Sequence, residues 1–247
     1  MEPFQRNYLI EKINEYNSKI KEGNIGEYKI IKTCEKRNLG YLHKKEENIE
    51  IPIPKLLNGN SCVMKISPLE IQSSYETIKY ARGNVGVVGL GIGYVVQEMA
   101  KKQEVKEVTV YECSKEIIDL YLNNFGENSK IKIIYGDAYK SSRKNFDYFF
   151  VDLYNYELSN KAVEDYKLFN KLHRIEEYVF WGVEHFLLSC SYEEIVWVYI
   201  PEIWMMMSKD IFGALDSSGY IDYYEKLDDN LVNNTLMEFK KILNEEE

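Results

Sequence analysis

The residues best suited to chemistry in this 247-residue chain are three glycines at alternate positions, Gly89, Gly91 and Gly93. They follow the apolar run Val85–Val88 and precede a helical pattern that begins at Tyr94. Glycine is needed where a backbone turns sharply and where a ligand approaches the main chain more closely than a Cβ atom allows. The N–H groups at the start of the next helix can then bind a polar ligand. The turn is therefore a candidate ligand site, with close helix–strand packing as the alternative.

Three carboxylates follow later β-rich runs. Glu112 closes the second run, at the spacing of roughly 20 residues at which an acidic side chain accepts hydrogen bonds from ribose hydroxyls. Asp137 follows the third run, in position to meet an adenine amino group, although it could instead cap a turn. Asp152 ends the apolar run Tyr148–Val151. Because ligands bind at the carboxyl ends of parallel strands, we expect the glycine turn and these carboxylates to share one edge.

The glycine pattern narrows the type of nucleotide ligand. A dinucleotide site requires G-x-G-x-x-G, but Tyr94 stands at the third glycine position and the chain reads G-x-G-x-G. The lysine of a phosphate-binding P-loop is missing, which excludes that motif.

With these motifs, residues 60 to 183 resemble the class I S-adenosylmethionine-dependent methyltransferase superfamily, and within it most closely the spermidine synthase (polyamine aminopropyltransferase)-like group. In that group the first strand and turn read like V-x-V-I-G-G-G-D-G-G, which aligns with Val85 to Tyr94. Most methyltransferases carry an acidic residue two positions before the first glycine. This chain has Val87 there, as the aminopropyltransferases do. The resemblance implies S-adenosylmethionine, or its decarboxylated form, as the cofactor.

The resemblance also assigns roles to residues. Ser67–Tyr80 stands where the family has its substrate-gating helix, which gives Gln72 and Tyr75 as substrate-binding candidates. Tyr154 and Asn155 are the other two substrate-binding candidates, because they follow the fourth strand, where side chains often wall a substrate pocket. Asp152 is the catalytic candidate. The cofactor-binding candidates are Gly89, Leu90, Gly91, Gly93, Glu112, Cys113, Asp137 and Ala138.

The chain departs from the aminopropyltransferase pattern at two positions. Ile92 replaces the aspartate that holds the amine end of the cofactor. The family's D-x-x-D-P stretch, with two aspartates that bind and deprotonate the attacking amine, is here Asp152-Leu153-Tyr154-Asn155-Tyr156, which lacks the second aspartate. Because amine chemistry needs carboxylates and a base, these departures favour methyl transfer over aminopropyl transfer.

The elements that must position these residues alternate between β-rich and helical from about Gly83 to Gly182. Such alternation predicts βαβ units and a parallel sheet. The expected strands are 85–88, 107–112, 130–135, 148–153 and 177–181, and the expected helices are 94–102, 114–125 and 161–172. The fold class we expect is α/β: a Rossmann-like, doubly wound, mostly parallel sheet with a small N-terminal helix plus β-hairpin segment.

The flanking segments give weaker patterns. Apolar residues at helical spacing predict a first helix (Leu9, Ile13, Tyr16 and Ile20). Prolines at 52 and 54 in a β-rich run indicate an edge strand or a small hairpin sheet. Ser67 and Glu70 are typical of a capping box that opens a helix. We expect an N-terminal unit of residues 1–82 and a Rossmann-like unit of 83–247, in which the β-rich run Val196–Ile200 helps to complete the sheet.

Composition limits the function classes. The net charge of −9 disfavours nucleic-acid binding, which requires a basic face. The four cysteines form no CxxC pair and the histidines number three, so neither a metal site nor a disulfide framework is expected. No apolar stretch approaches the roughly 20 residues of a membrane span, and the N-terminus has no signal-peptide pattern. We expect a cytoplasmic protein, with a homodimer possible.

The leading hypothesis is an S-adenosylmethionine-dependent methyltransferase that acts on a small molecule, possibly an amine. Two alternatives stay open. One is an aminopropyltransferase that uses decarboxylated S-adenosylmethionine, and the other is a non-catalytic protein that binds an adenosyl ligand.

Overall fold

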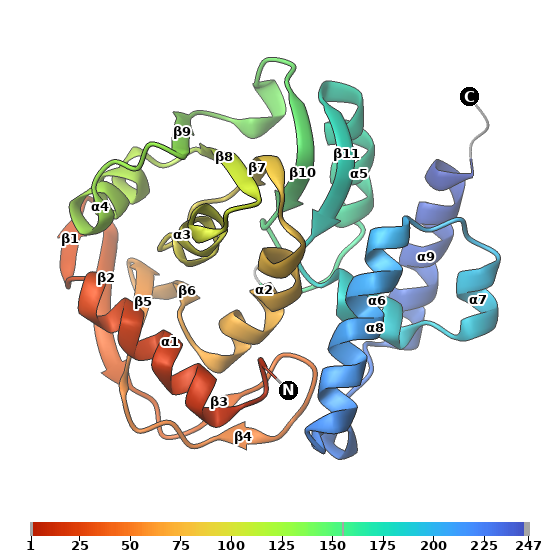
Figure 1. Ribbon diagram of the computed structural model, residues 1–247, viewed down its shortest axis with the longest axis horizontal. Coiled ribbons are helices and arrows are strands. Elements are labelled where there is room, and N and C mark those ends of the chain that lie inside the picture. Colours follow the sequence, from red (N-terminus) through yellow and green to blue (C-terminus); the bar gives the residue numbers. More distant parts are fainter. Residues whose placement is uncertain (1, 155, 245–247) are drawn as a thin grey trace.

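The computed structural model describes residues 2–154 and 156–244. Five parallel strands form its central sheet, in the order β11-β10-β7-β8-β9 (Figure 1). Their bounds are Gly83–Val88 for β7, Val105–Glu112 for β8, Ile131–Tyr135 for β9, Asn145–Val151 for β10 and Arg174–Phe180 for β11. Numbered from β7, this order is 3-2-1-4-5, that of the Rossmann-like doubly wound sheet. The predicted fold class is confirmed.

The strand order creates the place where a ligand can bind. The chain leaves β7 toward β8 and β9, and it then returns to the other side of β7 to form β10. The connections after β7 and β10 therefore diverge, which opens a crevice at their carboxyl ends. Helices link the strands: α3 (Tyr94–Lys101), α4 (Lys115–Phe125), the short 3₁₀ helix η1 (Ala138–Lys140) and α5 (Lys161–Leu172).

Burial explains why these strands form as expected. The run Tyr148–Val151 in β10 is at most 1% exposed, as befits a strand with neighbours on both sides and helices on both faces. Ser114 caps α4 by accepting a hydrogen bond from the Ile117 N–H, and Gly126 ends that helix. The apolar run of β10 and the capping residues of α4 therefore favour the same elements that burial stabilises in the folded protein.

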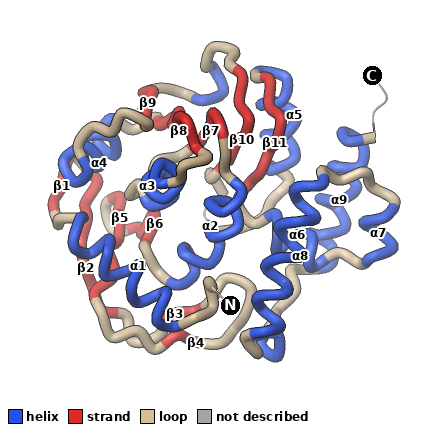
Figure 2. The backbone as a smooth tube through the Cα atoms, viewed as in Figure 1, coloured by secondary structure: helices blue, strands red, loops and turns tan. Residues whose placement is uncertain are grey.

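The N-terminal segment forms its own antiparallel sheet, in the order β1-β2-β5-β6 (Figure 2). The strands are Gly23–Ile25, Tyr28–Cys34, Pro52–Asn58 and Ser61–Lys65, and a small ladder joins β3 (Asn38–Leu39) to β4 (Glu46–Glu47). Helix α1 (Arg6–Lys19) buries Leu9, Ile13 and Tyr16 as predicted. Helix α2 (Pro68–Tyr80) leads into the parallel sheet.

Of the two alternatives for the proline-containing run, the hairpin sheet is confirmed and the edge strand is wrong. Strand β5 lies between β2 and β6. Pairing with β6 begins only at Lys55, and the Pro54 carbonyl accepts from the Ile66 N–H beyond the end of β6. The missing N–H groups of Pro52 and Pro54 therefore fall where the ladder to β6 has not begun, which makes the prolines compatible with a central strand.

The segment after β11 is helical, so the prediction that Val196–Ile200 completes the sheet was wrong. Its elements are α6 (Val183–Ser189), α7 (Tyr192–Val196), α8 (Glu202–Ser217), η2 (Tyr220–Tyr223) and α9 (Asp229–Leu243). Trp197 and Tyr199 are 72% and 82% exposed, so this apolar run is not buried in a sheet. Within residues 2–154 and 156–244, no helix has the length and apolar character that a membrane span requires. The division at residues 82 and 83 stays a prediction.

Candidate functional site

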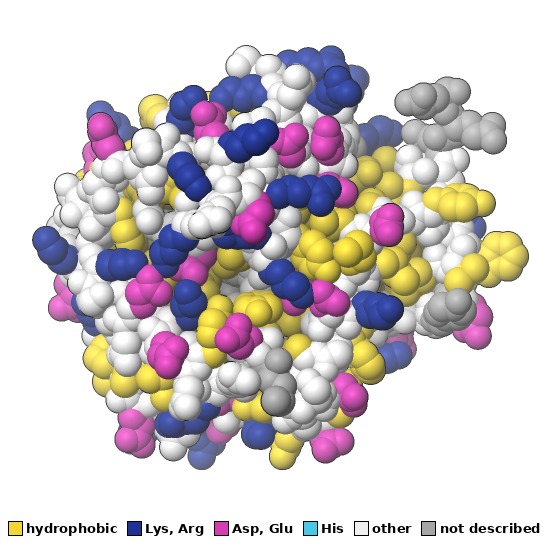
Figure 3. Space-filling view, in the orientation of Figure 1, with side chains coloured by type: hydrophobic (Ala, Val, Ile, Leu, Met, Phe, Trp, Pro, Cys, Tyr) yellow, Lys and Arg dark blue, Asp and Glu magenta, His cyan; other side chains and the backbone are white. Residues whose placement is uncertain are grey.

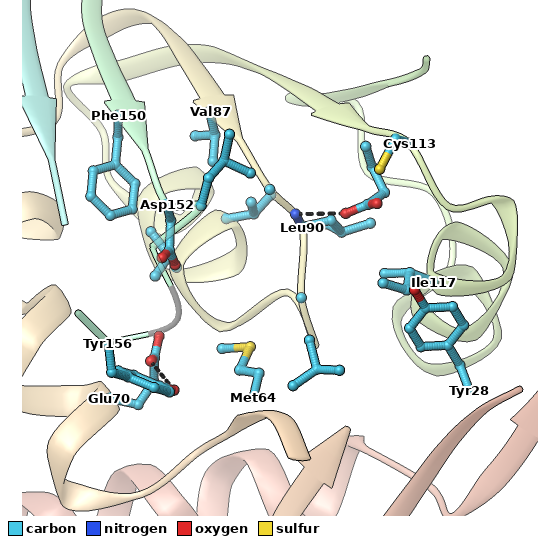
Figure 4. A pocket seen from close by; sticks show the side chains of 17 residues that line it. Tyr28, Met64, Glu70, Val87, Leu90, Cys113, Ile117, Phe150, Asp152 and Tyr156 are labelled. Atoms are coloured by element: carbon cyan, nitrogen blue, oxygen red, sulfur yellow. Dashed lines mark hydrogen bonds between the residues drawn. The ribbon is translucent and has the colours of Figure 1, made fainter. Parts of the chain in front are cut away.

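A cavity of about 250 Å³ lies at the carboxyl edge of the parallel sheet, beside the turn after β7 (Figure 4). One wall comes from the ends of β7, β8 and β10 and from α3 and α4. The opposite wall comes from the antiparallel sheet and α2. Its lining comprises Tyr28, Val63, Met64, Glu70, Val87, Gly89, Leu90, Gly91, Val95, Val96, Glu112, Cys113, Ile117, Phe150, Asp152, Leu153 and Tyr156. The cavity therefore includes Asp152 and five of the eight predicted cofactor-binding residues.

The glycines of the turn have different roles. Gly89 has a φ of 99°, and a Cβ there would lie 2.7 Å from the Asp152 carbonyl oxygen, so this glycine allows the ends of β7 and β10 to meet. Gly91 has a φ of 53° and borders the cavity, where a Cβ would collide with the sulfur of Met64. Gly93 is the N-cap of α3 with a φ of 90°, and a Cβ there would meet the Tyr121 ring outside the cavity.

Besides the Gly89 N–H, which donates to the Tyr111 carbonyl of β8 at 3.0 Å, three N–H groups of this turn have partners within the chain. Leu90 donates to Glu112 Oε2 at 3.0 Å, and Gly93 donates to the Leu90 carbonyl at 2.9 Å. Ile92 donates to Met64 Sδ at 3.2 Å. A thioether is a weak acceptor. The Ile92 N–H is therefore the one of these three with the weakest partner.

Glu112 connects two loops at the edge of the sheet. Its Oε1 accepts from the Ser114 N–H at 2.8 Å, while its Oε2 accepts from Leu90. The side chain is 7% exposed and borders the cavity, and each of its oxygens retains a lone pair for a ligand hydroxyl. Cys113 lies beside it, where burial first and the Glu112 charge next raise the pKa of the thiol.

A second carboxyl group, which the sequence analysis did not assign to the site, lies at the same end of the cavity as Asp152. Glu70 on α2 is 2% exposed. Its Oε2 accepts from the Tyr156 hydroxyl at 2.8 Å, and its Oε1 accepts from the Ser74 hydroxyl at 3.2 Å. Figure 4 shows Glu70 and Tyr156 together on the same side of the cavity as Asp152. Two carboxyl groups and a phenol therefore line the same end of the cavity.

Burial and proximity shift the protonation of this pair. Burial raises the pKa of Glu70, and the negative charge of Asp152 raises it further. Burial also raises the pKa of Asp152. Two neighbouring carboxyl groups out of water resist carrying two negative charges, so the first proton leaves the pair more readily than the second. A cation bound between them would favour the doubly ionised state.

Glu70 was missed because the sequence pattern suggested another role for it. The expected capping box does not form: Ser67 makes no side-chain cap bond, and its buried hydroxyl lacks a partner in the described structure. The Glu70 side chain turns into the cavity instead. A signal was available, since an acidic residue on the helix that the resemblance identified as substrate-gating was itself a candidate.

The backbone at Tyr156 supports a functional role for this end of the cavity. Tyr156 has a φ of 63°, a conformation that costs a residue with a Cβ about 1–2 kcal/mol. The conformation brings the phenol within hydrogen-bond distance of Glu70. Strained backbone of this kind is concentrated at functional sites.

Asp137 and Ala138, the predicted adenine contacts, lie outside the cavity lining. Asp137 caps η1 by accepting from the Tyr139 N–H at 3.0 Å, which is the alternative that its sequence context left open. Its side chain is 41% exposed, and Ala138 is buried beneath it. Strand β9 neighbours β8, so both residues lie one strand beyond Glu112.

The three predicted substrate-binding residues that the structure describes lie outside the cavity lining. Tyr154 turns away and donates to Asp165 on α5 at 3.1 Å. Gln72 is buried and accepts from the Tyr41 N–H at 2.9 Å, on a different face of α2 from Glu70. Tyr75 donates to Glu2 at 3.2 Å near the N-terminus. Asn155 lies outside the described residues.

The charge of the lining is one-sided. Among the described residues that line the cavity, Glu70, Glu112 and Asp152 are acidic, and none is Lys, Arg or His. Carboxylates in partly water-excluded surroundings attract cations and repel anions. The cavity therefore suits a ligand that carries positive charge.

No protein-family model matches the sequence, and the search of curated proteins also gives no match. Similar solved structures include spermidine synthase from Thermotoga maritima, with 13% identity, coverage of 63% of this chain and 52% of that chain, and a TM-score of 0.40. They also include an S-adenosylmethionine-dependent methyltransferase from Clostridium acetobutylicum, with 15% identity, coverage of 44% and 48%, and a TM-score of 0.36.

The matched region spans about half the length of each of these two proteins. Both groups named by the sequence resemblance thus occur among the structures that this chain is similar to. The fold assignment itself follows from the strand order of the parallel sheet.

Proposed function

We propose that this protein is an S-adenosylmethionine-dependent transferase that moves a group to a small-molecule amine. The observation that carries the proposal is the cavity itself, with a glycine turn and Glu112 at one end and the Glu70–Asp152 pair at the other. The sulfonium of such a cofactor supplies an activated carbon that an amine can attack. The acidic lining suits both a sulfonium and an amine.

Residues at the carboxyl edge of the parallel sheet would each bind a different part of the cofactor. Glu112, next to Cys113, would accept hydrogen bonds from the ribose hydroxyls of the cofactor. The turn from Gly89 to Gly91 would lie against the part of the cofactor that extends from the ribose toward the sulfur and beyond it. A ligand that extends one strand further would reach Asp137 and Ala138, which stay our proposed adenine contacts.

Glu70 and Asp152 would act on the acceptor. An ionised carboxylate attracts the ammonium form of an amine, and it can take the proton that the amine must lose before nitrogen attacks carbon. Overall, a nitrogen–carbon bond forms, the sulfur–carbon bond breaks, and one proton leaves. Holding both reactants in line can supply roughly 7–11 kcal/mol of the barrier.

Methyl transfer is the first candidate reaction. Aminopropyl transfer is the second, because Glu70 supplies from α2 the additional carboxylate that is missing after β10. The third possibility is a protein that binds an adenosyl ligand and catalyses no reaction. Incubating the protein with a polyamine mixture and each form of the cofactor, followed by mass spectrometry, distinguishes added methyl groups from added aminopropyl groups and from no product.

Asp152→Asn tests the catalytic role. We expect turnover to fall by at least about 100-fold, the lower end of the contribution of a general base, while cofactor affinity changes by less than about threefold. Asp222→Asn, an exposed carboxylate on η2, is the matched control and should leave both unchanged. Turnover that persists in Asp152→Asn would remove Asp152 from the mechanism.

A further inference from the structure

The side chain of Met64 occupies the part of the cavity that lies against the glycine turn. Its sulfur accepts from the Ile92 N–H at 3.2 Å, and a Cβ on Gly91 would lie 2.3 Å from that sulfur. Figure 4 shows Met64 between the Glu70–Tyr156 side and the Ile117–Tyr28 side of the cavity. The methionine therefore fills space that the glycine at position 91 leaves free.

A bulge in β6 directs Met64 to this place. Leu56 pairs with Met64 and Leu57 pairs with Cys62, which leaves Val63 as an extra residue on β6. In a regular strand, successive side chains point to opposite faces, and a bulge re-aims one of them. Val63 and Met64 both line the cavity, although they are adjacent in sequence.

The volume of the cavity agrees with partial occupation by Met64. At about 250 Å³, it lies just below the range of roughly 300–1,000 Å³ typical of small-molecule sites. The N–H groups before a helix are where the anionic end of a ligand is expected to bind. Here one of them faces a neutral thioether, and the described lining offers no cationic side chain as a substitute.

We propose that Met64 is a specificity-determining residue that excludes the amino-acid carboxylate of the adenosyl ligand and thereby selects ligands that lack it. The inference builds on the proposed function and favours the second of its two reactions, because the methyl donor S-adenosylmethionine carries this carboxylate and the decarboxylated aminopropyl donor does not. A ligand whose ribose meets Glu112 and whose sulfur faces Asp152 passes over the glycine turn, and its tail then reaches Met64 and the Ile92 N–H. A carboxylate there would have to displace the thioether and add a further acidic group beside the Glu70–Asp152 pair, which already resists carrying two negative charges.

The test compares two uncharged-sulfur ligands that share the adenosine part. S-adenosylhomocysteine carries the carboxylate, and methylthioadenosine lacks the whole amino-acid end. Dissociation constants measured by isothermal titration calorimetry should show the wild type binding methylthioadenosine at least about tenfold more tightly. In Met64→Ala, S-adenosylhomocysteine should gain affinity, so that the ratio of its dissociation constant to that of methylthioadenosine falls by about tenfold or more.

Two further variants make the result decisive. Met64→Val shortens the side chain but suits a strand, so it replaces the alanine variant if that protein does not fold. Met237→Ala removes an exposed methionine of α9 and should keep the wild-type ratio. If both ligands bind and the ratio of their dissociation constants is the same in the Met64 variants as in the wild type, the inference is overturned and the proposed function still stands. Failure of both ligands to bind the wild type would overturn both.

Discussion

At the scale of single residues, the Glu70 and Asp152 carboxyl groups should make the stability of the protein depend on pH. Each is held away from water, and each has a pKa above the ordinary range for a carboxyl group. The native protein therefore keeps protons on this pair that the unfolded chain releases near pH 4. Its contribution to stability is fully present below that pH and is lost as the pH rises through the raised pKa values.

Glu70→Gln should reduce this pH dependence, because glutamine carries no charge at any pH. Between about pH 5 and pH 9 we expect the Tm of the variant to fall less than that of the wild type. Some slope will remain, since burial also raises the pKa of Glu184 on α6. Thermal unfolding over this pH range provides the measurement, with Asp222→Asn expected to follow the wild type. Parallel curves for Glu70→Gln and wild type would show that Glu70 titrates normally.

At the scale of elements, the contact between the ends of β7 and β10 depends on Gly89. An alanine there would combine an unfavourable φ of 99° with a Cβ 2.7 Å from the Asp152 carbonyl oxygen. At Gly219 the φ is 77°, and a Cβ would have no atom within 4 Å, so an alanine meets only the left-handed backbone cost of about 1–2 kcal/mol.

Gly89→Ala should therefore destabilise the protein more than Gly219→Ala does. Urea unfolding monitored by circular dichroism gives the two free energies of unfolding. Equal losses would mean that the connections after β7 and β10 can separate at no cost, and the crevice between them would then be less rigid than the contact implies.

The elements also show what the sequence could and could not predict. The strands and helices from Gly83 to Phe180 were predictable because apolar runs, Ser114 and the glycines all agreed with burial between two helical layers. Val196–Ile200 was not, because an apolar run has the same appearance whether it enters a sheet or stays exposed. Glu70 and Met64 were not found either. Both reach the cavity from segments whose position depends on tertiary packing and on the bulge in β6.

At the scale of the whole molecule, one continuous core joins the parallel sheet to the C-terminal helices. Phe239 on α9 is fully buried, with ring centroids 5.1 Å from Trp204 on α8 and 5.6 Å from Phe180 on β11. Apolar side chains are also exposed on the side that these helices form (Figure 3). The exposed apolar residues of α8 include Met205, Met206 and Phe212.

Removal of the Phe239 ring should weaken the whole protein rather than release α9 alone. Phe239→Ala is expected to cost about 3–5 kcal/mol in the free energy of unfolding, the range for large aromatic truncations in a core. Met237→Ala on the same helix, where the side chain is 54% exposed, should stay within about 0.5 kcal/mol of the wild type. Unfolding should remain a single transition in circular dichroism and tryptophan fluorescence. Two separate transitions would contradict a shared core.

The acidic lining has a further consequence for how fast ligands arrive. A cavity lined by Glu112 and the partly protonated Glu70–Asp152 pair, in a chain of net charge −9, draws cationic ligands toward it over about a Debye length, roughly 10 Å at 0.1 M salt. Stopped-flow association rates for a sulfonium ligand should therefore fall as salt is added, while those for neutral methylthioadenosine should stay nearly constant. The same field slows the departure of a cation more than that of a neutral molecule, so in the proposed reaction the charge lost from sulfur would itself promote release of the spent cofactor.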